Sequence, residues 1–354
     1  MQLFLDLDKC RGCRLVPTRS ALAREYSMFA IRQYEFGAPE VLRYEEHPDP
    51  HAGPGQVRIA VRAAGVHLVD TTIRTGIGSG SFAPPELPMT PGREVAGVVD
   101  ELGDGVAASW LGARVVAHLG PASGGYASLA VRDVASVHLL PETVDFDAGV
   151  AMIGTGRTAM GILDAARIEE RDVVLVMAAA GGIGSLLVQA GRAAGATVVG
   201  LAGGPSKVAV VRELGADIVV DYRRPDWAAS VREALDGREV SVVCEGVGGS
   251  LGTDAMRLLG VGGRLVMFGW SSGQGVPTQV TVTDLMERGL TATWAIGPGM
   301  LRRRSLRSLE EEALASAASG RLRPVVQRFA LRDAAEAHRA LAGRESTGKV
   351  VLVP

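Results

Sequence analysis

The chain has 354 residues, which is enough for two domains with substantial cores. Apolar residues make up 47% and charged residues 21%, a balance typical of a globular protein. The net charge of −2 argues against a nucleic-acid groove, and no apolar run approaches the roughly 20 residues that cross a membrane. Three cysteines cannot form a disulfide framework, so a reducing, cytoplasmic setting is expected.

Residues 1–27 differ from the rest of the chain, because they show no clear periodicity. Cys10 and Cys13 have C-x-x-C spacing, but no second cysteine pair and no nearby histidine completes a metal site. We interpret the segment as an extension of doubtful function, with metal binding or redox chemistry as the alternative. It also lacks the apolar core and small-residue cleavage site of a secretory signal.

From Met28 onward the pattern is one of short strands separated by turn residues. Apolar alternation predicts a strand over 56–66, and further strands are expected at 94–102, 113–118 and 126–131. These strands indicate a compact β-rich domain, and a helix predicted over 154–166 leads out of it.

A βαβ pattern occupies residues 173–201. It consists of a buried-type strand, the glycine-rich turn AAAGGIG at 178–184, a helix and a second strand. Gly181 and Gly184 take the second and third glycine places of G-x-G-x-x-G, and Ala179 takes the first. Because the helix start offers unpaired N–H groups to a pyrophosphate, the pattern predicts a dinucleotide site. The alternative is a turn that only packs the helix on the strand.

The end of the second strand indicates which dinucleotide binds. NAD sites usually carry an acidic residue about 20 residues after the glycines, and this strand end, GLAGGPSK at 200–207, has none. A lysine and a hydroxyl suit a 2′-phosphate, so NADPH is the expected cofactor. A solvated lysine at a helix start is the alternative for Lys207.

Helices and strands continue to alternate up to residue 268, which predicts a doubly wound parallel sheet. Its ligand should lie at the carboxyl ends of the strands, where glycines occur at 246–249 and 269–273. The tail is expected to form helices over 306–318 and 331–341 and a closing strand over 349–353.

Several motifs together carry a family resemblance. They are GAPEVL (37–42), AAGVHLVDTTIRTG (63–76), TPGREVAGVV (90–99), SGGYASLAV (123–131), AAAGGIG (178–184), VMFGWSSG (266–273) and STGKVVLV (346–353). With them the chain resembles the medium-chain dehydrogenase/reductase superfamily, and within it the zinc-independent quinone oxidoreductases. The resemblance implies an α/β fold in which a Rossmann domain is inserted in a β-rich, GroES-like, partly open barrel domain. Residues 28–148 and 294–354 would form the GroES-like catalytic domain, and 149–293 the NADPH-binding domain.

The resemblance also implies which residues contact the cofactor. They are Thr158, Ala180, Gly181, Gly182, Ile183, Gly184, Lys207, Tyr222, Gly246, Phe268, Gly269 and Arg344. Lys207, Tyr222 and Arg344 would surround the 2′-phosphate, and the alternative for Tyr222 is a half-buried tyrosine at a strand end. Homodimerisation through an edge strand around 289–294 is a further expectation from the family.

The predicted catalytic residues are His67 and Asp70. His67 stands where quinone reductases usually have asparagine, and it is interpreted as a substrate-pocket residue, a packed or capped histidine, or a metal ligand. Asp70 would lie near the catalytic cleft or cap a helix at 71–74. No metal is expected, because the chain reads Gly92-Arg93-Glu94 where zinc enzymes carry Gly-His-Glu.

The expected reaction is hydride transfer from NADPH to a quinone or an α,β-unsaturated carbonyl, both small-molecule substrates. Thr72 and Gly78 replace two aromatic residues that often flank a bound quinone, which favours an enone. Trp270 either restores part of that stacking or is an ordinary rim aromatic. The alternatives are an enoyl or alkenal reductase of a biosynthetic pathway and a non-catalytic NADPH-binding protein.

Overall fold

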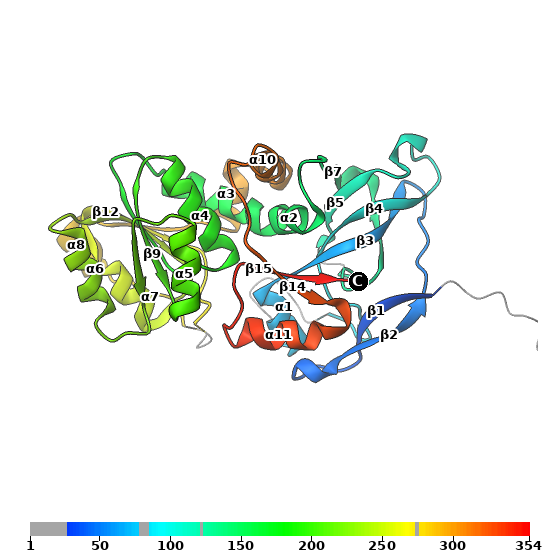
Figure 1. Ribbon diagram of the computed structural model, residues 1–354, viewed down its shortest axis with the longest axis horizontal. Coiled ribbons are helices and arrows are strands. Elements are labelled where there is room, and N and C mark those ends of the chain that lie inside the picture. The colour runs from blue at the N-terminus through cyan, green and yellow to red at the C-terminus, as the bar shows by residue number, and fades with distance from the viewer. Residues whose placement is uncertain (1–26, 78–84, 121–122, 273–275) are drawn as a thin grey trace, which may run out of the picture.

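The computed structural model describes residues 27–77, 85–120, 123–272 and 276–354. Two sheets organise the chain, and Figure 1 shows them in two lobes that lie side by side. Of the features singled out in the sequence, Cys10, Cys13, Gly78 and Gly273 lie outside the described residues. The predicted extension is also outside them, except for Ser27, which opens the first strand.

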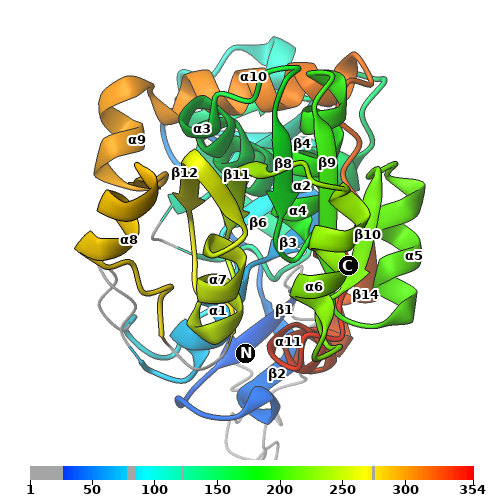
Figure 2. The same cartoon turned by 90° about the vertical axis from the view of Figure 1, so that its left-hand side faces the viewer.

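One sheet is parallel and six-stranded. Its strands are β8 (Val173–Val176), β9 (Thr197–Ala202), β10 (Ile218–Asp221), β11 (Val240–Glu245), β12 (Leu259–Met267) and β13 (Thr291–Trp294). They follow the order β10-β9-β8-β11-β12-β13, and Figure 2 shows β12, β11, β8, β9 and β10 across this lobe. Every residue of β8 is buried, as expected of a β-branched run in a sheet covered on both faces.

Helices cover both faces of the six-stranded sheet. The core on one face includes α3 (Arg157–Ala166), α4 (Gly182–Ala193) and α5 (Pro205–Glu213). The core on the other face includes α6 (Trp227–Leu235), α7 (Gly249–Met256) and α8 (Val282–Arg288). The predicted doubly wound sheet is therefore confirmed. Its strand order reverses between β8 and β11, which is where such a sheet binds its ligand.

The second sheet is built from both ends of the chain. Its strands are β3 (Gln56–Val66), β4 (Glu94–Leu102), β5 (Arg114–His118), β6 (Leu129–Asp133), β7 (Val137–Leu139), β14 (Val326–Ala330) and β15 (Lys349–Val353). They follow the order β14-β15-β3-β4-β5-β7, and β6 pairs with β3 outside that path. The C-terminal strand β15 runs antiparallel to β3. A separate hairpin of β1 (Ser27–Gln33) and β2 (Leu42–Pro48) completes this lobe.

The remaining helices are α1 (Leu68–Arg74), α2 (Phe146–Ala151), α9 (Pro298–Arg303), α10 (Leu306–Ala318) and α11 (Ala334–Ala342). Buried residues of α3, α4 and α10 share one core cluster with residues of the second sheet. The domain boundaries at 148/149 and 293/294 therefore stay a prediction, because helices from the two sides of each boundary pack together.

Three of the predicted elements begin in a different way from the prediction. The helix expected over 154–166 opens with a π-helical turn, Met152–Gly156, ahead of α3. The strand expected at 126–131 forms only as β6, because the backbone of Tyr126 bonds Pro91 and Ile31 instead of continuing along β3. The helix expected over 331–341 opens with a 3-10 turn, Leu331–Asp333, before α11.

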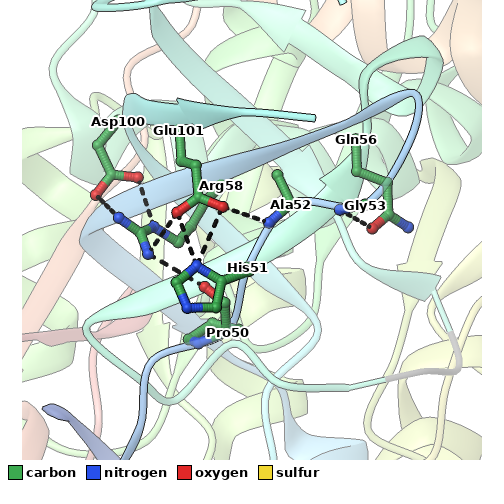
Figure 3. Close-up of polar contacts among 8 residues, drawn as sticks. All are labelled: Pro50, His51, Ala52, Gly53, Gln56, Arg58, Asp100 and Glu101. Atoms are coloured by element: carbon green, nitrogen blue, oxygen red, sulfur yellow. Dashed lines mark hydrogen bonds and ion pairs between the residues drawn. The ribbon is translucent and has the colours of Figure 1, made fainter. Parts of the chain in front are cut away.

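Exposed ion pairs fix the loop that enters β3, at its amino-terminal end (Figure 3). Arg58 lies 3.0 Å from a carboxylate oxygen of Asp100 and 2.7 Å from one of Glu101. Glu101 also accepts the N–H of Ala52 at 2.8 Å and lies 3.1 Å from His51 Nδ1. These contacts join the incoming loop to β4, so we assign them a structural role.

Candidate active site

The glycine-rich turn places the start of α4 against the end of β8. A Cβ atom on Gly184 would stand 2.3 Å from the carbonyl oxygen of Ala178, so only glycine permits this approach. Gly181 is the N-cap, and no side chain in the described part of the chain caps the helix. No capping side chain therefore competes with an anion such as a pyrophosphate at the start of α4.

A group of cations lies beyond the end of β9. Lys207 Nζ donates to the carbonyl oxygen of Arg344 at 2.7 Å, which brings the tail of the chain to the start of α5. The ring of Tyr222 lies against Gly203, 3.0 Å from the position that a Cβ would take there. Burial, followed by the charges of Arg223 and Arg344, lowers the pKa of Lys207. Converging positive charge of this kind suits a phosphate.

Sequence reasoning missed one member of this cationic group. Arg223 lies 3.0 Å from the place of a Cβ on Gly204, at the turn into α5. Asp221 fixes the turn by accepting the N–H groups of Gly204 and Arg223, at 3.0 and 2.9 Å. The available signal was position, since Arg223 directly follows Tyr222 at the carboxyl end of β10.

The carboxyl ends of β11 and β12 meet at a second group of predicted residues. A Cβ on Gly246 would stand 2.4 Å from the ring of Phe268, and one on Gly269 would stand 3.2 Å from the carbonyl oxygen of Gly246. The buried Glu245 holds this turn by accepting the N–H of Gly248 at 2.8 Å and the hydroxyl of Thr278 at 2.7 Å.

A buried polar cluster lies between the two lobes, and it contains the predicted His67. His67 Nε2 is 2.6 Å from one carboxylate oxygen of Glu94, and Lys349 Nζ is 2.9 Å from the other. Glu94 is 0% exposed and Lys349 is 4% exposed. Burial alone would raise the pKa of Glu94, but the charges of His67 and Lys349 outweigh it and hold that pKa well below its ordinary value. Sequence reasoning assigned no role to Glu94 or Lys349.

This cluster adjoins the glycine-rich turn. A Cβ on Gly154, in the π-helical turn, would stand 3.2 Å from His67 Cε1. A Cβ on Gly182 would stand 3.6 Å from Lys349 Cα. Thr158, another predicted residue, lies one turn on and donates its hydroxyl proton to the carbonyl oxygen of Gly154 at 2.8 Å. The turn and the polar cluster therefore form one continuous site.

His118 joins the site from β5. It pairs across the sheet with Glu94, so the two side chains lie on the same face. Its Nδ1 accepts the N–H of Gly120 at 3.0 Å. Burial lowers the pKa of His118 to about 4, partly offset by Glu94 and reinforced by Arg157. The imidazole is therefore neutral at physiological pH.

Asp70 is buried and is the third residue of α1, whose N-cap is His67, so it does not precede a helix at 71–74 as its cap. It accepts the N–H of His67 at 2.8 Å and the hydroxyl of Tyr126, whose Oη lies 3.1 Å away. His338 Nδ1 faces Arg74 at 3.1 Å, and its Nε2 faces Tyr126 at 3.1 Å. Because a guanidinium only donates, Nδ1 accepts and Nε2–H donates to Tyr126. This chain of bonds ties the start of α1, next to His67, to α11.

The aromatic surface of the site is on the Rossmann side. Trp270 and Trp294 stack with ring centroids 5.4 Å apart, and both rings are exposed. Thr72, where the resemblance leads one to expect an aromatic residue, is a half-buried residue of α1.

Two further features concern the predicted cofactors and partners, namely groups of metal-ligating side chains and membrane-spanning helices. In the described part of the chain, no group of three or more His, Cys, Asp or Glu side chains is placed to hold a metal ion. The ammonium of Lys349, close to both His67 and Glu94, would itself repel a cation. No helix within the described ranges is long and apolar enough to span a membrane.

Comparison with known proteins gives consistent matches. Residues 53–142 match the alcohol dehydrogenase GroES-like domain, and residues 182–313 match the zinc-binding dehydrogenase family. A quinone oxidoreductase of Pseudomonas aeruginosa is 32% identical over 90% of this chain and 97% of its own length. A 2-haloacrylate reductase of Burkholderia is 33% identical over 90% of this chain and 96% of its own. The structure of Escherichia coli quinone oxidoreductase complexed with NADPH superposes with a TM-score of 0.79, at 30% identity, over 92% of this chain and all of that one.

Proposed function

This chain belongs to the quinone oxidoreductases of the medium-chain dehydrogenase/reductase superfamily, and from that premise we propose that it transfers a hydride from NADPH to a quinone or an α,β-unsaturated carbonyl. It is an oxidoreductase that uses a nicotinamide cofactor and acts on a small molecule. What we propose beyond this is that the cofactor carries a 2′-phosphate, and that the acceptor is a quinone or an α,β-unsaturated carbonyl.

The observation that carries the choice of NADPH is the cationic group at the end of β9. Lys207, Arg223 and Arg344 converge there, and the strand end from Gly200 to Lys207 has no carboxylate to bond a ribose 2′-hydroxyl. The 2′-phosphate would lie against these side chains and Tyr222.

The rest of the cofactor would lie along the predicted residues of the site. The pyrophosphate would meet the N–H groups at the start of α4, formed by Ala180, Gly181, Gly182, Ile183 and Gly184. The ribose and nicotinamide would lie between Thr158, Gly246, Phe268 and Gly269. When bound, the cofactor supplies the hydride.

For the acceptor, the proposal assigns His67 to the wall of the substrate pocket and Asp70 to positioning. Asp70 holds the N–H of His67 and thereby sets where the imidazole stands. The exposed Trp270–Trp294 stack supports a planar acceptor, since an aromatic face binds a conjugated ring or enone by offset stacking.

Homodimerisation and a cytoplasmic setting complete the proposal. β13 is an edge strand of its sheet, and its Trp294 is an exposed apolar side chain. An edge of that kind is commonly covered by a second copy. Sedimentation or light scattering that finds only monomers at micromolar concentration would exclude the dimer.

The deciding experiment follows NADPH oxidation at 340 nm against quinones, alkenals, cyclic enones and enoyl thioesters, with NADH in parallel. Turnover with quinones or simple enones supports the proposal, whereas activity restricted to enoyl thioesters would favour a biosynthetic enoyl reductase. NADPH binding without reduction of any acceptor would favour a non-catalytic binding protein.

A further inference from the structure

We infer that His118 is a catalytic residue, whose Nε2–H donates a hydrogen bond to the carbonyl oxygen of the acceptor. The inference rests on the proposed function, which requires a donor at that oxygen. It adds a residue of β5 to the predicted catalytic residues His67 and Asp70.

The hydrogen bonds of His118 fix which ring nitrogen carries the proton. Nδ1 accepts from the backbone N–H of Gly120 at 3.0 Å, so it bears no hydrogen. A neutral imidazole then has its single N–H at Nε2. Its pKa of about 4 keeps the ring neutral at physiological pH. Within the described ranges, no group forms a hydrogen bond with Nε2. Nε2 is also not one of the fully buried side-chain atoms that lack a hydrogen-bond partner. The donor is therefore both present and uncommitted.

The neighbouring donors are already committed. His67 Nε2 lies 2.6 Å from a carboxylate oxygen of Glu94 and 3.1 Å from Lys349 Nζ, so it is enclosed by the buried ion pair. Lys349 is almost fully buried and pairs with the second oxygen of Glu94 at 2.9 Å. A substrate oxygen in this pocket could take neither donor without breaking a buried pair.

The position of His118 places its ring at the same site as those residues. It is the cross-strand partner of Glu94, and its charge interactions are with Glu94, Arg157, His67 and Arg93. Arg157 precedes Thr158, which is proposed to lie at the nicotinamide, and pairs with Glu310 at 2.8 Å. His118 therefore lies where the wall of the β-rich lobe faces the cofactor end of the site.

The chemistry needs such a donor. When hydride adds to the β-carbon of an enone, the electron pair of the carbon–carbon double bond moves onto the conjugated carbonyl and leaves an enolate oxygen. Water then supplies the proton at the α-carbon, so one hydride and one proton are added in all. The Nε2–H of His118 stabilises the charge on that oxygen without giving up its proton. One such donor contributes roughly 100-fold to 1000-fold in kcat in other enzymes.

The test compares His118→Leu, which removes the donor at similar size, with His118→Gln, whose amide nitrogen reaches about as far as Nε2. Single-turnover oxidation of NADPH is measured with the best acceptor of the wild-type chain. Hydride transfer should slow by about 100-fold or more in the leucine variant and by much less in the glutamine variant. NADPH affinity, measured by fluorescence titration, should stay the same in both variants.

A second readout does not depend on turnover. In the presence of NADP⁺, 4-nitrophenolate serves as a probe of the enolate oxygen, and its binding is followed by its absorbance shift. The leucine variant should bind it at least 10-fold more weakly than the glutamine variant, at equal NADP⁺ affinity. Equal rates and equal phenolate binding in wild type and His118→Leu would overturn the inference. A wild-type chain that reduces no acceptor overturns the proposed function instead, and phenolate binding then decides the role of His118 separately.

Discussion

Lys349→Met should destabilise the protein strongly, because it removes the ammonium from a buried ion pair. Glu94 is 0% exposed and would be left with His67 as its remaining charged neighbour in the cluster. Removing one partner of a buried pair typically costs about 3–5 kcal/mol. At roughly 2–4 °C per kcal/mol, the melting temperature should fall by about 6–20 °C. Thermal and urea unfolding followed by circular dichroism measure this loss.

The depressed pKa of Glu94 also predicts how the stability deficit of Lys349→Met changes with pH. In the wild type the pKa of Glu94 is depressed, so the stabilisation is present above the ordinary glutamate pKa and is lost as the pH falls below it. In Lys349→Met, burial is opposed less and the pKa of Glu94 rises. The deficit relative to wild type should then be largest near pH 7 and smaller near pH 5, where the carboxyl begins to take up a proton.

Two further variants control this experiment. Lys207→Met removes a half-buried lysine whose hydrogen bond goes to a backbone carbonyl, and it should cost only about 0.5–1.5 kcal/mol. Adding Glu94→Gln to Lys349→Met removes the stranded charge, so the double variant should be more stable than Lys349→Met alone. An equal deficit at pH 7 and pH 5, together with a double variant no better than the single one, would refute the reasoning.

The other predictions concern binding and the network behind α1. Lys207→Ala or Arg223→Ala should weaken NADPH binding by about 10-fold to 100-fold, the equivalent of one charge-assisted hydrogen bond, and leave NADH binding unchanged in fluorescence titrations; equal losses for both cofactors would contradict the 2′-phosphate site. Tyr126→Phe strands the Nε2–H of the buried His338 and should lower the free energy of unfolding by about 1–3 kcal/mol in urea titrations. Trp270→Ala should raise KM by about 2-fold to 12-fold for planar quinones and less for small aliphatic enones; the same change for both classes would make Trp270 a rim residue.

Elements whose signal is local were predicted well from the sequence. The strand at 56–66 and the helix at 306–318 have the predicted bounds, because apolar periodicity and capping depend on residues that are close together in the sequence. The π-helical turn Met152–Gly156 was not predicted, because its backbone pattern depends on packing against Glu94 and His67 from other elements. Apolar periodicity alone predicts an ordinary helix at such a turn.

The site divides in the same way. Lys207 and Arg344 were predicted together only through the family resemblance, and the structure does bring them into contact. His67 and Lys349 are 282 residues apart, so no spacing rule relates them. What the sequence did show was a charged residue at the start of each of two apolar strands, Glu94 in EVAGVV and Lys349 in KVVLV. Such charges are usually interpreted as exposed strand ends.

Gly65 explains how these two strands can share one ion pair. β3 lies between β15 and β4 in the sheet, so a pair between Lys349 and Glu94 must reach across it. A Cβ on Gly65 would stand 2.2 Å from the Glu94 carboxylate and 3.0 Å from Lys349 Cε, so only a residue without a side chain leaves the space. A glycine inside a strand indicates that another group approaches the backbone closely, but it does not identify that group. The identity of that group depends on the order of the strands in the sheet, which places β15, the last strand of the chain, beside β3, the first long strand.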